Sequence, residues 1–228
     1  MGLNKAKGNM YSFITHTWNP VRGKCEFNCT YCYVDKWGRN TNPVHLDEAD
    51  LNTNLGEGNY IFVCSGCDLF HDSVPWNWVE DIFSATEDYR GNSYLWHTKN
   101  PYEARAHYTK FGKRDTLCVT IESNRNYADV SKAPLPANRF GSLFEWEKPW
   151  MLTIEPIMDF DLDIFKTLIL RNKPIQINIG ADSGGNKLPE PPREKVEELI
   201  ELLAPYTTIH LKKNLRRILP ESRYYGTH

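Results

Sequence analysis

Long apolar stretches are absent from this chain of 228 residues. No run approaches the roughly 18 apolar residues that a bilayer-spanning helix requires, so we expect no membrane span. An apolar leader is also missing after Met1, which argues against secretion and against a framework of disulfides. The net charge of -2 provides no overall attraction to nucleic acid, so contact with a polyanion would need a local basic patch. We therefore expect a soluble protein of a reducing compartment, the cytoplasm.

The six cysteines are unevenly placed, and three of them fall within eight residues. Cys25, Cys29 and Cys32 form the pattern C-x3-C-x2-C. Thiolates at this spacing can hold three irons of a cubane cluster and leave the fourth iron without a protein ligand. An open iron implies a ligand from outside the chain, as an open position does at a catalytic zinc.

A structural zinc site is the alternative for the same region. Cys64 and Cys67 form a second pair with C-x2-C spacing and could complete a zinc site with Cys29 and Cys32. The interval of 31 residues between Cys32 and Cys64 is longer than in a zinc ribbon, which favours the iron–sulfur cluster. The zinc alternative predicts a zinc-stabilised nucleic-acid-binding module without catalysis.

Short apolar or β-branched runs alternate with stretches of helical pattern, which predicts an α/β fold with parallel strands. The expected strands are Tyr11–Ile14, Tyr60–Val63, Ser93–Trp96, Leu117–Thr120, Met151–Ile154, Ile175–Ile179 and Thr208–Leu211. The expected helices are Trp76–Ala85, Pro101–Thr109, Leu162–Arg171 and Arg193–Leu203. Periodicity does not separate a doubly wound sheet from a partial barrel, but in both folds ligand loops follow the carboxyl ends of the strands.

The cysteine pattern, followed by the aromatic Tyr33, resembles the signature of the radical S-adenosylmethionine (SAM) enzymes. The resemblance implies a partial (β/α)6 barrel with outer helices and a [4Fe–4S] cluster held by Cys25, Cys29 and Cys32. It also implies that SAM binds the fourth iron and that Tyr33 lies along its adenine. Reductive cleavage of SAM would supply a 5′-deoxyadenosyl radical that abstracts hydrogen from a substrate. The electron would come from an external donor of the flavodoxin or ferredoxin type.

Length and resemblance together predict a single radical SAM-like domain over residues 1–228. Within it we expect the cluster loop at 15–33, a flexible insertion at about 35–59 and a C-terminal extension at about 205–228. The insertion is polar and rich in Asn and Gly, which fits either a lid or a surface excursion without function.

Further SAM contacts are expected in the loops that follow the predicted strands. The resemblance assigns the loop after Tyr60–Val63 to the SAM amino group and Lys99 to the SAM carboxylate. Two Ile-Glu pairs, which end in Glu122 and Glu155, would aim carboxylates into one pocket for ribose hydroxyls or the sulfonium. The cofactor-binding candidates are Tyr33, Ser65, Gly66, Asp68, Lys99, Thr120, Glu122, Glu155 and Gly180.

Several of these candidates have a second interpretation. Lys99 could be a solvated lysine, and Glu122 and Glu155 could be caps or salt-bridge partners. Asp68 could instead cap the turn before Leu69. Gly180 begins a glycine-rich turn that suits close approach by a ligand but equally suits a plain tight turn. It is not a phosphate-binding loop of the Walker type, because no Gly-Lys-Ser/Thr follows. Ser-Gly-Cys-Asp also stands where radical SAM enzymes often have Gly-Gly-Glu.

Ordered motifs beyond the cysteines resemble the phage Gp37/Gp68 family. They are Thr-Trp-Asn-Pro-Val before the cysteines, then Asp-Leu-Phe, Thr-Lys-Asn-Pro, Ile-Glu-Pro and Gly-x-x-Ser-Gly after later strands. Cys64 and Cys67 depart from that pattern. The resemblance implies a bacterial or phage-infected host cell. Together with the cations Lys212, Lys213, Arg216 and Arg217, it suggests modification or isomerisation of a nucleobase in phage DNA, or of a nucleoside. No catalytic side chain is assigned.

Overall fold

The computed structural model describes residues 2–8, 10–36, 38 and 42–225. Its contacts divide the chain into two compact units, which we describe separately. Unit 1 contains residues 1–28 and 32–118, and unit 2 contains residues 29–31 and 119–228. The single domain expected over 1–228 stays a prediction.

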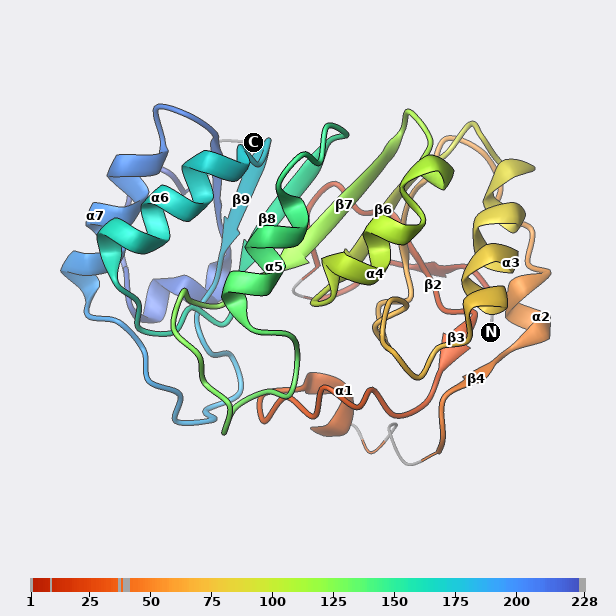
Figure 1. Ribbon diagram of the computed structural model, residues 1–228, viewed down its shortest axis with the longest axis horizontal. Helices are drawn as coiled ribbons and strands as arrows, with labels where there is room; N and C mark the ends of the chain where they lie inside the picture. Colours follow the sequence, from red (N-terminus) through yellow and green to blue (C-terminus); the bar gives the residue numbers. More distant parts are fainter. Residues whose placement is uncertain (1, 9, 37, 39–41, 226–228) are drawn as a thin grey trace. The chain divides into compact units, whose positions relative to one another are not determined.

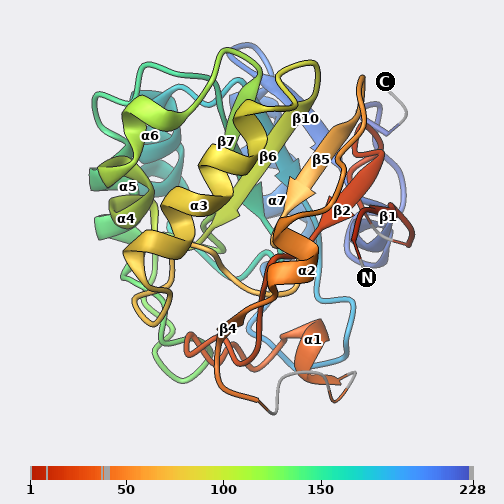
Figure 2. The ribbon, with the colours of Figure 1, turned by 90° about the vertical axis from the view of Figure 1, so that its right-hand side faces the viewer.

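Unit 1 is built on a set of neighbouring strands, which are labelled in Figure 2. Strand β2 (His16–Trp18) pairs in parallel with β5 (Tyr60–Val63), which pairs in parallel with β6 (Ser93–Thr98). Strand β1 (Asn4–Lys5) is antiparallel to β2. The other elements of this unit are β3 (Val21–Arg22), α1 (Tyr33–Lys36), β4 (His45–Leu46), α2 (Glu48–Leu51), α3 (Trp76–Glu87), α4 (Pro101–Ala106) and the 3-10 helix η1 (Tyr108–Lys110).

Helix α3 packs through a single apolar face. Val79, Ile82 and Phe83 are buried and recur at helical spacing. Phe83 stacks on Trp96 of β6, with ring centroids 4.1 Å apart. The ring contact holds α3 against the strand whose carboxyl end leads into the predicted Lys99 loop.

Unit 2 repeats the parallel arrangement. Strand β7 (Asp115–Thr120) begins in unit 1 and ends in unit 2. Strand β8 (Trp150–Ile154) pairs in parallel with β9 (Gln176–Ile179), and β9 pairs in parallel with β10 (Thr208–Leu211). The helices are α5 (Pro136–Leu143), α6 (Leu162–Asn172), α7 (Arg193–Leu203) and the 3-10 helix η2 (Lys213–Arg217). Helix α6 contacts both α5 and α7 (Figure 1).

Parallel strands with accompanying helices in both units confirm the predicted α/β class. The six predicted strands from Tyr60 onward and the four predicted helices are all present, with bounds shifted by a few residues at most. No helix in the described ranges is long and apolar enough to cross a membrane.

The first predicted strand, Tyr11–Ile14, is wrong. These residues form a turn in which Ile14 N donates to Tyr11 O at 3.0 Å, and the strand begins only at His16. Tyr11 and Ile14 are both buried, so their apolar pattern reflects a packed turn. Helix α5 was not among the predicted helices, and its segment contains Gly141, a weak helix former.

Part of the predicted insertion at 35–59 is anchored to the rest of unit 1. The Asp50 side chain is buried, accepts a hydrogen bond from Gly2 N at 2.6 Å and pairs with Arg22. The indole of Trp18 donates to Asp50 O at 2.7 Å. The segment therefore contributes to the core, although residues 37 and 39–41 lie outside the described residues. The predicted C-terminal extension likewise supplies β10 and η2 to unit 2.

Candidate cofactor-binding site

The three cysteines of the C-x3-C-x2-C pattern lie between β3 and α1. Cys25, Cys29 and Cys32 are partly exposed, and none is in a disulfide. By their contacts, Cys25 and Cys32 belong to unit 1 and Cys29 belongs to unit 2. Within the described ranges, no group of three or more His, Cys, Asp or Glu side chains is gathered as a metal site requires. The three thiols nevertheless fit an iron–sulfur cluster by donor chemistry, since cysteine sulfurs are its usual ligands.

The middle of the cysteine motif is held by a loop of unit 2. Cys29 Sγ lies 3.1 Å from Ser131 Oγ. The next residue, Thr30, donates its backbone N–H to Val130 O at 2.9 Å. These two contacts fix the backbone and the thiol of Cys29 relative to the loop that follows β7.

Glu122, a SAM candidate at the end of β7, lies in a buried polar network. Glu122 and Arg139 are each 3% exposed and form an ion pair of 2.8 Å. The Tyr31 hydroxyl donates to the other carboxylate oxygen. Arg139 also donates to Thr120 O at 2.9 Å and to Pro134 O at 2.6 Å. The predicted contacts of Glu122 and Thr120 with SAM stay predictions, and burial leaves Glu122 little surface for a ligand.

Glu155 and Gly180, two further SAM candidates, lie together in unit 2. A Cβ atom on Gly180 would lie 2.6 Å from Glu155 Oε1 and 2.9 Å from Asn214 Oδ1. Lys212 Nζ donates to Glu155 Oε2, and Asn214 Nδ2 donates to Glu155 Oε1 at 2.6 Å. Each carboxylate oxygen of Glu155 therefore has a donor, and the donors follow β10. Lys212 was expected only as a member of the cation run and Asn214 was not expected, although their position after a strand end was the signal that could have identified them as partners.

Tyr33, Ser65 and Gly66 meet in unit 1, where Asn19 holds the turn after β5. Asn19 Oδ1 accepts hydrogen bonds from Ser65 Oγ at 3.0 Å and from Gly66 N at 3.1 Å. The Tyr33 hydroxyl donates to Ser65 O. The loops that follow β2 and β5 are thus joined through side chains. Asn19 is a positioning residue that the sequence analysis did not single out.

Asp68 connects the loops after β5 and β6. Its Oδ1 accepts from Phe70 N at 3.0 Å and from Thr98 Oγ1 at 2.7 Å, and its Oδ2 accepts from Lys99 N at 2.7 Å. Burial raises the pKa of the Asp68 carboxyl above its ordinary value, although these hydrogen bonds act in the opposite direction. The bond to Phe70 N is the turn cap expected in the alternative interpretation. The contact of Asp68 with SAM, and that of the Lys99 ammonium, stay predictions.

Cys64 and Cys67 are buried in unit 1. Burial raises the pKa of the Cys64 thiol to about 12. Burial also raises the pKa of the Cys67 thiol, and nearby charge on Cys25, Cys64 and Cys32 adds to the shift. Cys67 is therefore close to two of the predicted cluster ligands. Substitution of single cysteines is needed to separate the cluster from the zinc alternative.

The four cations near the C-terminus do not form one free surface. Lys212 is 8% exposed and is paired with Glu155, as described above. Arg217 pairs with Glu190, and Arg216 lies over the ring of Tyr225 at 4.0 Å from its centroid. Lys213 is exposed. The cation run therefore provides a weaker case for a polyanion contact than its sequence indicated.

Comparison with protein families gives one match over most of the chain. The family described as "Protein of unknown function (DUF5131)" matches residues 9–151. No curated protein matches the chain.

Solved structures of two kinds of enzyme share its fold. A spore photoproduct lyase with bound AdoMet and dinucleoside spore photoproduct matches with a TM-score of 0.58 at 10% identity, covering 85% of this chain and 63% of that one. A second spore photoproduct lyase structure matches with a TM-score of 0.60 at 10% identity, covering 88% and 64%. Streptococcus suis SuiB matches with a TM-score of 0.55 at 11% identity, covering 86% and 48%. The chain thus spans less than two thirds of the length of each. Both are radical SAM enzymes, and the likeness confirms the predicted α/β fold of the radical SAM type.

Proposed function

The chain belongs to the DUF5131 family of proteins of unknown function. We propose that it is a radical SAM enzyme. Cys25, Cys29 and Cys32 would hold a [4Fe–4S] cluster, whose open iron would take SAM. With an electron from a flavodoxin or ferredoxin, the bound cluster and SAM would supply a 5′-deoxyadenosyl radical for hydrogen abstraction, with release of methionine. The role of the chain is to bind and orient SAM and the substrate.

One observation carries the proposal. The chain presents three partly exposed cysteines, none in a disulfide, in the spacing of the radical SAM signature. The fold that it shares with radical SAM enzymes supports the same assignment. A disulfide would have left these sulfurs unable to bind iron as thiolates.

In unit 2, we assign Glu155 to the ribose hydroxyls of SAM. The Glu155 side chain is 18% exposed, whereas that of Glu122 is 4% exposed, so a ligand reaches Glu155 more readily. Lys212 donates to one carboxylate oxygen and Asn214 to the other. The carboxylate is thus oriented before the ligand binds, which lowers the entropic cost of binding.

In unit 1, we assign the ring of Tyr33 to the adenine of SAM. Tyr33 is 47% exposed, and its hydroxyl donates to Ser65 O, so an accessible aromatic side chain is held at a defined position. The turn at Ser65 and Gly66 offers backbone carbonyls for the SAM amino group. Lys99, whose backbone N–H is held by Asp68, would reach the SAM carboxylate.

For the substrate, we propose a nucleobase or nucleoside that is modified or isomerised, in phage DNA or free. One of the similar spore photoproduct lyase structures holds a dinucleoside spore photoproduct, and the motif order of this chain resembles the phage Gp37/Gp68 family. The proposed location is the cytoplasm of a bacterial or phage-infected cell. The cation run lends only weak support, because Lys212 is engaged with Glu155.

The test is anaerobic purification with iron and sulfide reconstitution, followed by dithionite and SAM. We expect about four irons and four sulfides per chain and 5′-deoxyadenosine detectable by mass spectrometry. Cys25→Ala should lose both the cluster and the product. Cys118→Ala is the matched control, because Cys118 is buried in β7 and belongs to no proposed cluster or zinc ligand set.

Stoichiometric zinc without iron, retained in Cys25→Ala but lost in Cys64→Ala, would overturn the proposal. That pattern would identify the zinc-stabilised module, whose ligands would be Cys29, Cys32, Cys64 and Cys67. An intact cluster with no SAM cleavage would instead identify a family member that keeps the cofactor without turnover.

A further inference from the structure

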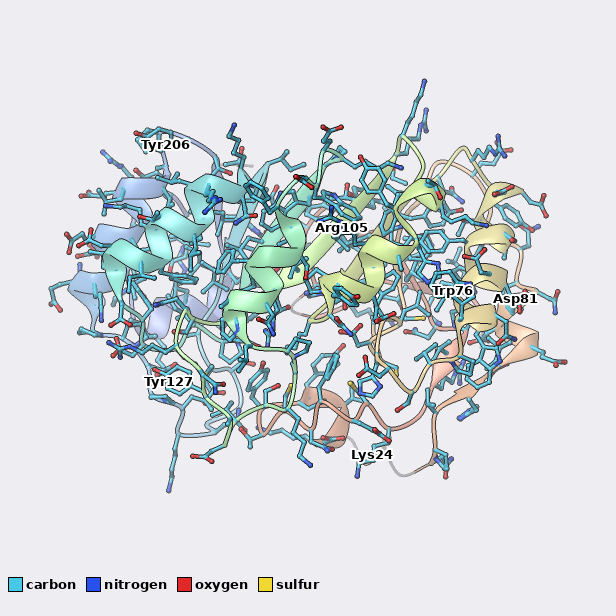
Figure 3. All side chains as sticks on the ribbon, in the orientation of Figure 1. Lys24, Trp76, Asp81, Arg105, Tyr127 and Tyr206 are labelled. Carbon is cyan, nitrogen blue, oxygen red and sulfur yellow. The ribbon has the colours of Figure 1, made fainter. Side chains whose placement is uncertain are left out.

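The loop after β7 is a fixed platform within unit 2. Val130 N and Ser131 N both donate to Tyr127 O, at 2.9 and 3.2 Å, which closes a turn. The hydroxyl of Tyr127, labelled in Figure 3, donates to Asp159 O at 2.8 Å. Ser131 is therefore held at a defined place by backbone contacts on its N-terminal side.

The Ser131 hydroxyl faces the sulfur of Cys29. The Sγ–Oγ distance is 3.1 Å, and the neighbouring bond from Thr30 N to Val130 O keeps the two segments aligned. Ser131 Oγ also accepts a hydrogen bond from Ala133 N at 3.1 Å. With one lone pair occupied in this way, the hydroxyl hydrogen is free to point at the sulfur. A thiolate that binds iron carries no hydrogen, so Ser131 must be the donor in the loaded protein.

We propose that Ser131 donates a hydrogen bond to the Cys29 thiolate and thereby raises the reduction potential of the cluster. This inference rests on the proposed function. Reduction adds one negative charge to the cluster and its sulfurs, and a donor at a sulfur stabilises the more negative state. Ser131 is a positioning and tuning residue, since it touches a ligand of the cluster and not the reacting atoms.

The test compares two variants of nearly equal shape. Ser131→Thr keeps the hydroxyl, whereas Ser131→Val replaces it with a methyl group. Each protein is reconstituted anaerobically and titrated with dithionite in the presence of redox mediators, and the reduced cluster is followed by electron paramagnetic resonance. We expect the midpoint potential of Ser131→Val to be more negative than that of the wild type, and Ser131→Thr to stay near the wild type. Iron and sulfide content and circular dichroism report folding and loading.

The outcomes distinguish this inference from the proposed function. If wild type binds no cluster, both fail together. If all three proteins bind a cluster and share one midpoint potential, the proposed function stands and the role of Ser131 is wrong. If Ser131→Val does not bind a cluster, the reduced clusters of wild type and Ser131→Thr are examined by pulsed electron paramagnetic resonance in H2O and D2O. In that case Ser131→Thr and wild type must both show an exchangeable proton coupled to the cluster, and its absence overturns the inference.

Discussion

At Gly180, the missing side chain allows Glu155 and Asn214 to approach the main chain of the turn after β9. The Asn214 amide donates to Glu155 Oε1 and to Ala181 O, so it joins the carboxylate to the turn. A residue with a Cβ atom would have to push apart this hydrogen-bonded group. Glycine is not needed at this position for its conformational freedom, because Gly180 does not adopt a positive φ.

We predict that Gly180→Ala lowers the free energy of unfolding by about 1–3 kcal/mol, as overpacking of a tight site does. It should also weaken SAM binding, since Glu155 is displaced. Urea unfolding and isothermal titration with SAM measure the two effects.

Gly141→Ala is the matched control for that substitution. Nothing lies within 4 Å of a Cβ atom at this position, which is inside helix α5. There we expect a gain of roughly 0.5–1 kcal/mol, because alanine favours the helix. Equal effects of the two substitutions would contradict the steric account of Gly180.

At the scale of elements, a charged network joins the loop after β7 to α6 and α7. Arg125 pairs with Asp159 and Asp161, which precede α6, and Asn124 Oδ1 accepts from Asp161 N at 2.8 Å. Lys195 of α7 donates to Asp159 Oδ1 at 2.8 Å. Two helices and the loop that carries Ser131 are thus connected through carboxylates.

This network predicts a pH dependence of stability. The hydrogen bond from Arg125 lowers the pKa of Asp161. Burial alone would raise the pKa of Asp159, but hydrogen bonds from Lys195 and Arg125 outweigh it and lower the pKa. For a folded pKa below the unfolded value of 3.8, the stabilisation is complete above that value and disappears as the pH falls through the folded pKa. We therefore expect the urea midpoint to fall as the pH is lowered below about 4, the ordinary pKa of Asp.

Arg125→Met should lower the urea midpoint at pH 7 and reduce its fall towards pH 3. Lys166→Met is the control, because its exposed pair with Asp163 on α6 contributes little. An unchanged pH profile in Arg125→Met would show that the network does not stabilise the protein.

At the scale of the whole molecule, the last part of the chain completes the core of unit 2. Ile209 and Leu211 of β10, Leu215 of η2 and Leu219 beyond it are at most 5% exposed. Each such side chain contributes about 1.5–3 kcal/mol by burial. Four of them together approach the full stability of a typical domain, about 5–15 kcal/mol.

Deletion of residues 208–228 should therefore abolish cooperative unfolding of unit 2. Circular dichroism during heating and limited proteolysis measure this loss. Tyr206→Ser is the control, since Tyr206, labelled in Figure 3, is 72% exposed and should leave the unfolding midpoint unchanged. A truncated protein with the wild-type midpoint would contradict the assignment of β10 to the core.

Local sequence pattern was enough to predict the α/β class and the six strands from Tyr60 onward. Buried parallel strands read as continuous apolar runs, and α7 has an apolar stripe, so local pattern was sufficient for them. Where burial occurs without regular structure, as at Tyr11–Ile14, the same pattern was misleading.

Local pattern did not predict which side chains meet, because that depends on how the chain folds. Ser131 reaches Cys29 across 102 positions, Lys212 reaches Glu155 across 57, and Ser65 reaches Asn19 across 46. Spacing in the chain carries no information about such pairs, because they arise when separate strands are brought side by side. Lys212 illustrates the point: in sequence it belongs to an apparently exposed run of cations, and folding places it beside a carboxylate. Residue order was thus enough to predict candidate ligands, whereas packing determines the partners that orient each group.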